Sequence, residues 1–97
     1  MGRERRTGDG AALTAVADAV RAARERFEAV AGTPVEAVTA AERDGSGWRL
    51  AVEVVEVRRI PDSTSIVADY TVDLDGEGNL TGYRRRSRHV RGRAGGG

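Results

Sequence analysis

The sequence predicts an α+β fold in which one N-terminal amphipathic helix packs on a four-stranded antiparallel β-meander. Apolar residues recur at helical spacing over residues 11–31, and beyond Pro34 the apolar residues alternate with a period of two. Turn-forming glycines separate the alternating segments, and the connections are too short for the crossovers of a parallel sheet. We expect one domain over residues 11–93, with disordered tails at 1–10 and 94–97.

The predicted helix spans residues 11–31 and ends before Gly32 and Pro34, which are typical helix-terminating residues. Its apolar side chains fall three or four positions apart and form one stripe along about five turns. The stripe consists of Leu13, Val16, Val20, Ala23, Phe27 and Val30. We expect this stripe to face the sheet, with Val20 and Phe27 as core anchors.

The four predicted strands lie at about residues 35–43, 48–59, 65–75 and 80–90. We expect Trp48, Val52 and Tyr70 to anchor the sheet side of the core, because large side chains on alternate strand positions share one face. A ligand platform is the alternative role for Trp48. The alternation slips at Val54-Val55, which indicates either a bulge or a strand covered on both faces.

Two of the connections permit a functional as well as a structural interpretation. Residues 60–64 contain Pro61 and form either a recognition loop or a plain strand connector. Residues 73–80 place oxygen-bearing side chains as a calcium-binding loop does, but Arg84 stands where such a loop needs a bidentate glutamate. We therefore expect an ordinary glycine-rich hairpin turn there and no metal site.

Composition excludes several classes of function. The 97 residues contain no cysteine, so disulfides, cysteine-based zinc sites and thiol catalysis are excluded. The longest apolar run, at residues 50–57, is broken by two glutamates and falls short of the ~20 residues that a membrane span needs. His89, the sole histidine, has no serine at a catalytic motif spacing. We expect a cytoplasmic protein with no catalytic residues, no cofactor and no small-molecule substrate.

Charge is strongly segregated along the chain although the net charge is only +1. Residues 34–82 carry four arginines and ten acidic residues, whereas residues 83–97 carry six arginines and no acid. This asymmetry predicts a partner for the basic end or an acidic surface of the same chain against which it lies. The predicted partner-binding residues are Arg84, Arg85, Arg86, Arg88 and Arg91.

Three interpretations of this basic end remain open. It could dock on an acidic protein, since arginine offers a planar donor fork that suits carboxylates as well as phosphates. It could be an edge strand guarded by charge, with Asp69 opposite or near Arg85 neutralising part of that charge across strands. It could also bind nucleic acid through phosphate contacts, although Tyr83 is the only aromatic residue beside it.

An ordered set of segments resembles the gas vesicle protein O family. The segments are Gly47–Glu56, Arg59–Asp62, Asp73–Gly78, Gly82–Arg85 and Arg88–Gly92. The resemblance covers roughly residues 23–92 and departs at His89, where an aromatic residue is expected. It implies a cytoplasmic accessory protein that is needed for gas vesicle formation and is distinct from the small hydrophobic shell subunit. The family has no established catalytic residues.

Together, the resemblance and the charge pattern predict a non-catalytic protein–protein adaptor in gas vesicle assembly. Its partners would be other gas vesicle accessory or shell proteins, and it would be associated with gas vesicles in the cytoplasm. A nucleic-acid-binding regulator that uses the arginine-rich C-terminal strand is the alternative function.

Overall fold

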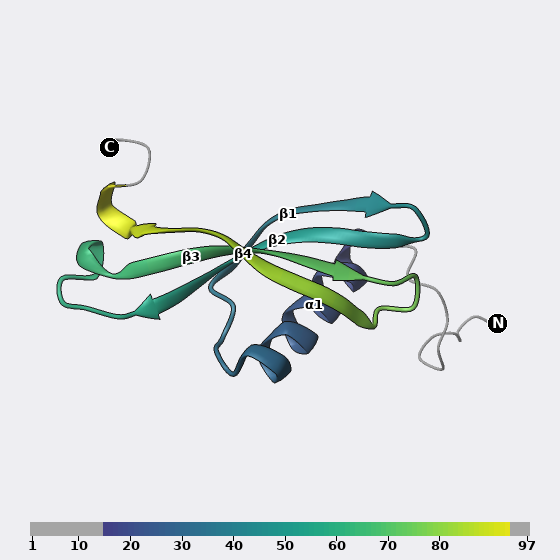
Figure 1. The fold of residues 1–97 in the computed structure, drawn as a ribbon, viewed down its shortest axis with the longest axis horizontal. Coiled ribbons are helices and arrows are strands. Elements are labelled where there is room, and N and C mark those ends of the chain that lie inside the picture. Colours follow the sequence, from purple (N-terminus) through teal and green to yellow (C-terminus); the bar gives the residue numbers. More distant parts are fainter. Residues whose placement is uncertain (1–14, 94–97) are drawn as a thin grey trace.

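Residues 15–93 are described by a computed structural model, in which one helix lies across one face of a four-stranded sheet (Figure 1). The elements are α1 (Val16–Ala31), β1 (Ala37–Asp44), β2 (Gly47–Val57), the 3₁₀ helix η2 (Asp62–Thr64), β3 (Ile66–Leu74), β4 (Leu80–Val90) and the 3₁₀ helix η3 (Arg91–Arg93). The predicted α+β class is confirmed. The tails predicted at 1–10 and 94–97, and residues 11–14 of the predicted helix, lie outside the described residues.

The sheet is a meander in the order β1-β2-β3-β4, with each strand antiparallel to the next. The connections span residues 45–46, 58–65 and 75–79, and connections this short favour antiparallel pairing of consecutive strands. In the turn between β1 and β2, Gly45 adopts a left-handed φ of 63°. In the turn between β3 and β4, the Asp75 carboxylate accepts the backbone N–H groups of Glu77 and Asn79, both at 2.9 Å.

These turn contacts also explain why the calcium-loop pattern appears in a hairpin. The backbone and side-chain N–H groups of Asn79 hold the pKa of Asp75 below its usual range, with a further contribution from the N–H of Glu77. The carboxylate oxygens that a cation would require are thus engaged by the turn itself. Among the described residues, no three histidine, aspartate or glutamate side chains gather where they could hold a metal ion.

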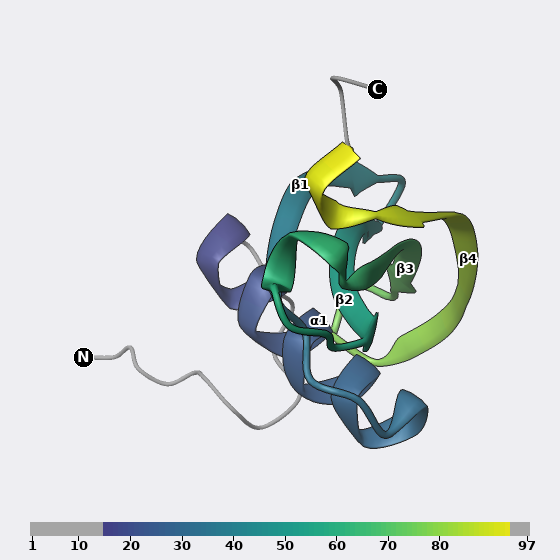
Figure 2. The ribbon, with the colours of Figure 1, turned by 90° about the vertical axis from the view of Figure 1, so that its left-hand side faces the viewer.

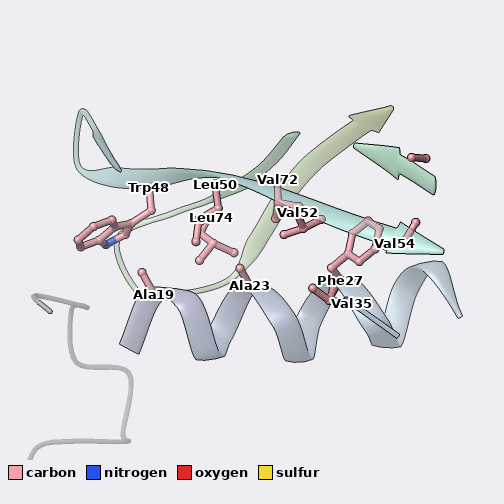
Figure 3. Packing of buried hydrophobic residues seen from close by; sticks show 11 residues of the cluster. Ala19, Ala23, Phe27, Val35, Trp48, Leu50, Val52, Val54, Val72 and Leu74 are labelled. Carbon is pink, nitrogen blue, oxygen red and sulfur yellow. The ribbon is translucent and has the colours of Figure 1, made fainter. Parts of the chain in front are cut away.

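The helix packs on the sheet through a narrower stripe than the predicted one (Figure 3). Its buried residues are Ala19, Ala23 and Phe27. The expectation was wrong for Val16 and Val30, which are 52% and 57% exposed, while Val20 is half-buried at the rim of the core. Residues four apart lie on one helix face, and the two alanines let the helix backbone approach the strands closely. Within residues 15–93, no helix is long and apolar enough to cross a membrane.

The sheet contributes alternate residues of its two central strands to the core. They are Trp48, Leu50, Val52 and Val54 of β2 with Ala68, Val72 and Leu74 of β3, and Figure 3 shows most of them above the helix. Trp48 is 2% exposed and the Arg43 guanidinium lies 5.0 Å from its ring centroid, so the indole has no open face for a ligand. Tyr70 is half-buried and its ring centroid lies 5.1 Å from that of Phe27.

The pairing between neighbouring strands is irregular at two positions that belong to the candidate site. The sequence slip at Val54-Val55 corresponds to a register shift between Val55 and Val57, which leaves Glu56 outside the regular pairing. A second register shift, in the pairing of β3 with β4, leaves Arg86 outside the regular pairing. A bulge re-aims the neighbouring side chains, so both irregularities affect which charged groups can meet.

The sheet curls at the end that carries η2 and η3. In the end-on view of Figure 2, β4 bends round and brings η3 back toward β1. The Arg91 backbone N–H donates to the Ser65 carbonyl at 2.8 Å, and its side chain reaches Glu36, immediately before β1, at 3.6 Å. Gly92 lies so close to η2 that a Cβ there would stand 2.6 Å from the Ser63 carbonyl oxygen. The two 3₁₀ helices therefore pack against each other and close this end.

Candidate functional site

The candidate site is the arginine-rich edge of the sheet formed by β4 and η3. β4 pairs with β3 on one side only, and its arginines are exposed. Four of the five predicted partner-binding arginines lie on β4, and Arg91 opens η3. Pairing with β3 holds the arginine-bearing backbone in an extended form. The structure divides the five side chains into two groups.

Arg85 and Arg88 converge on the carboxylate of Glu56. Arg88 donates from Nε to Oε1 at 2.7 Å, and Arg85 donates from Nη1 to both carboxylate oxygens at 3.3 Å. The Tyr70 hydroxyl donates to Oε2 at 3.3 Å. The side chain of Glu56 is only 20% exposed, and the hydrogen bond from Arg88 is the main cause that lowers its pKa. Burial and the Glu56 charge together raise the pKa of Tyr70.

Arg91 is engaged at the curled end of the sheet by a second group of charges. It donates from Nη1 to Asp62 at 2.5 Å, and its Nη2 lies 3.6 Å from Glu36. Arg58 bridges the same two carboxylates, at 3.2 Å from Asp62 and 3.5 Å from Glu36. The hydrogen bond from Arg91 is the main cause of a lowered pKa at Asp62, and the same bond raises the pKa of Arg91. Two arginines and two acids therefore join the ends of three segments.

The acid that neutralises β4 is not the one expected. Asp69 pairs with Ser87 and accepts its hydroxyl hydrogen bond at 2.8 Å. Arg85 instead stands opposite Tyr70 and turns to Glu56 of β2. Two register shifts in this pairing, at Thr81 and at Arg86, each move β4 by one residue, so Asp69 faces Ser87 and Arg85 stands one position away. Charge on the edge strand is neutralised across strands, but from one strand further into the sheet.

Arg84 and Arg86 form the second group. Neither makes an ion pair with any residue from 15 to 93, and both side chains are exposed. Arg84 pairs with Thr71 and lines a shallow hollow of about 230 Å³ together with Asp73, Gly82 and Tyr83. Asp73 is itself held by Arg49 at 2.8 Å. Within the described residues the two arginines therefore offer unpaired guanidinium groups at an open sheet edge, which suits them to carboxylates of a partner.

Two features of the surface could not be found from the sequence. Glu56 binds two of the five predicted partner-binding arginines, yet in the sequence it is only an interruption of an apolar strand. The slip in alternation beside it was the only signal. Ile60, in the connection between β2 and β3, is 99% exposed. An isoleucine before a proline does not reveal its own exposure, because burial depends on what the rest of the chain packs against it.

Comparison with known proteins gives consistent matches. The family model described as Gas vesicle synthesis protein GvpO matches residues 3–95. The chain is 44% identical to Gas vesicle protein O of a Streptomyces species over 75 residues, which cover 77% of this chain and 59% of that protein. It is 40% identical to Gas vesicle protein O1 of Halobacterium salinarum over 70 residues, covering 72% and 59% of the two chains. No solved structure matches.

A third relative, Gas vesicle protein O of Haloferax mediterranei, is 43% identical over 49 residues, which cover half of this chain and 35% of that protein. The chain thus spans less than two thirds of the length of the curated relatives it matches.

Proposed function

This chain belongs to the gas vesicle protein O family, and from this premise we propose that it is a non-catalytic adaptor in gas vesicle assembly. The family is one of gas vesicle synthesis proteins and is not a known enzyme family. The role of this chain is therefore connected with gas vesicles. We propose that it binds another gas vesicle accessory or shell protein and is associated with gas vesicles through that partner.

The observation that carries the adaptor role is the division of the five arginines. Arg85, Arg88 and Arg91 are bound by acids of the same chain, which accounts for their presence without a partner. Arg84 and Arg86 have no such acid within residues 15–93 and do not contribute to the core. Two arginines on an edge strand that make no ion pair with the described part of the chain favour an acidic protein surface as partner. Charged surfaces of this kind mainly set the encounter rate and the specificity, so we expect transient complexes.

The direct test measures binding of the full chain to each gas vesicle protein of its source organism, purified one by one. We expect Arg84→Ala and Arg86→Ala each to weaken the interaction at least about threefold, and the double variant about tenfold or more. Arg21→Ala is the matched control, because Arg21 is also exposed and its replacement removes the same charge from α1. Its affinity should stay within about twofold of the unaltered chain. Equal affinity of the double variant and the unaltered chain would overturn the assignment of these two residues.

The nucleic-acid alternative is tested with the same variants on mixed-sequence duplex DNA. We expect no binding at about 150 mM salt, because segment 34–82 carries ten acidic residues against four arginines and repels phosphates. Tight binding that falls steeply with salt and is lost in the double variant would favour the regulator. In cells, a deletion strain complemented with the unaltered or the double-variant gene should form vesicles only with the former. Pressure-collapsible light scattering measures this.

A further inference from the structure

We propose that the connection from Arg59 to Asp62, here called the Ile60 loop, is a second docking surface. Its Ile60 side chain enters an apolar pocket on a partner protein, and carboxylates at the rim of that pocket bind Arg59. The inference rests on the proposed adaptor role and adds a second contact to it. Val90 pairs with Ile66, which follows this loop, and Arg84 lies six residues before Val90, or roughly 20 Å along the strand. The Ile60 loop and the surface that contains Arg84 are therefore separate.

Ile60 is the most exposed large apolar residue of the described chain. Its side chain is 99% exposed, whereas Val30, Val16 and Tyr83 are 57%, 52% and 41% exposed and lie beside other residues of the fold. Single apolar residues on a surface are common and need no explanation by themselves. An isoleucine that is almost fully exposed on a loop held by hydrogen bonds is different, because such a loop could equally carry a polar residue at that position.

Hydrogen bonds on both sides hold the backbone of Ile60. The N–H of Arg59 donates to the Ser65 hydroxyl at 3.0 Å. The carbonyl of Pro61 accepts the N–H of Thr64 at 2.9 Å and the Thr64 hydroxyl at 2.7 Å. Ser65 is completely buried, so the loop is tied to the interior rather than to solvent. The direction in which Ile60 points is therefore set before any partner arrives.

Asp62 fixes the base of the same loop. Its carboxylate accepts the Ser65 hydroxyl at 3.0 Å and the guanidinium groups of Arg58 and Arg91. The packing of η2 against Gly92 adds a backbone contact that leaves no room for a side chain. A side chain presented by so constrained a loop loses little freedom on binding, and a β-branched residue loses less still. This arrangement is typical of an anchor residue that fills a preformed pocket.

The charges beside Ile60 indicate the chemistry of the partner. Arg58 is engaged by Glu36 and Asp62, so its charge is already balanced. The side chain of Arg59 has no ion pair with any residue that the structure describes, and it is the direct neighbour of Ile60. An apolar tip with an adjacent unpaired guanidinium is complementary to an apolar pocket with acidic residues at its rim. A plain strand connector would require neither feature.

The test uses the full chain against the same set of individually purified gas vesicle proteins, titrated by isothermal calorimetry. We expect Ile60→Ala to weaken binding at least about tenfold and Ile60→Asp to abolish it, while Ile60→Leu stays within about threefold. Val30→Ala is the matched control, since it truncates another exposed apolar side chain on a different element, and it should leave the affinity unchanged. Melting curves establish that each variant is folded.

The outcomes separate this inference from the proposed function. If Arg84→Ala/Arg86→Ala loses affinity and Ile60→Asp binds like the unaltered chain, the adaptor stands and the second surface is refuted. If no gas vesicle protein binds the unaltered chain, both are refuted. If the chain sediments as a dimer that Ile60→Asp dissociates, the occupant is a second copy and the partner proposed here is wrong. Loss of binding in Ile60→Asp with retention in Ile60→Leu supports the inference.

Discussion

Phe27 joins α1 to the sheet, and replacing it with alanine tests whether this one side chain holds the helix in place. The ring is completely buried and contacts the rings of Tyr70 and Tyr83, at centroid distances of 5.1 and 5.3 Å. Truncating a buried phenylalanine to alanine costs about 3–5 kcal/mol in other proteins. We expect the upper part of this range, because the other buried helix residues are the small Ala19 and Ala23, which cannot refill the space.

This loss is large compared with the total stability that a domain of this size has. About 80 residues at the usual stability per residue give roughly 4–12 kcal/mol, so Phe27→Ala removes a third of it or more. Urea unfolding followed by Trp48 fluorescence and by far-ultraviolet circular dichroism measures the change. We also expect the melting temperature to fall by ~15 °C or more.

Val30→Ala is the control for this experiment, because it shortens an apolar side chain on the same helix that is 57% exposed. Its effect should stay within about 0.5 kcal/mol. If Phe27→Ala costs less than about 1 kcal/mol, the helix is held by something other than this contact, and our account of the core is wrong.

Two further predictions concern the charged edge and a close backbone contact. Glu56→Gln removes the charge that Arg85 and Arg88 share, and should cost about 1 kcal/mol at pH 7. Because Arg88 and then Arg85 lower the pKa of Glu56 from 4.5, this stabilisation is present above that value and is lost as the pH falls through the lowered pKa. Urea unfolding curves of both proteins should therefore converge in acid, and a constant difference would contradict the ion-pair account. Gly47→Ala places a Cβ 2.1 Å from the Leu74 carbonyl oxygen, so β2 and β3 must separate at a cost of about 2 kcal/mol or more. Gly82→Ala, which meets nothing within 4 Å, is its control in thermal melts, and equal melting temperatures would refute the steric argument.

The fold class follows from local signals in the sequence, whereas the strand order was decided by the tertiary structure. Turn residues at Asp44–Gly47 and Asp75–Asn79 return the chain at once, and connections this short predict antiparallel pairing. The sequence left open whether β1 lies at the edge of the sheet or within it, and the structure places it at the edge. The alternating apolar residues of β2 and β3 specify which face is covered. The turns and the alternation depend on neighbours within a few residues, so for them the tertiary structure did not have to be known.

The sequence did not determine which face of α1 packs on the sheet. The predicted stripe contains the valines at 16, 20 and 30, the buried stripe contains Ala19, and Ala23 and Phe27 belong to both. Hydrophobicity favours the valines, but close packing on a sheet favours the smaller side chains. Only the surface presented by β2 and β3 decides between them, and that surface does not exist until the strands have paired.

The division of the arginines is likewise a property of the tertiary structure. The sequence by itself determined that a basic end follows an acidic segment, and it left open whether the acids of this segment or a partner would meet those cations. The irregular pairing at Glu56 and Arg86 decided it, because a shift of one residue moves each side chain to a new neighbour. An ion pair requires its charged atoms to lie within about 4 Å of each other, and the order of charges along the chain does not determine that distance. Arg84 and Arg86 are therefore distinguished from Arg85 and Arg88 by register alone.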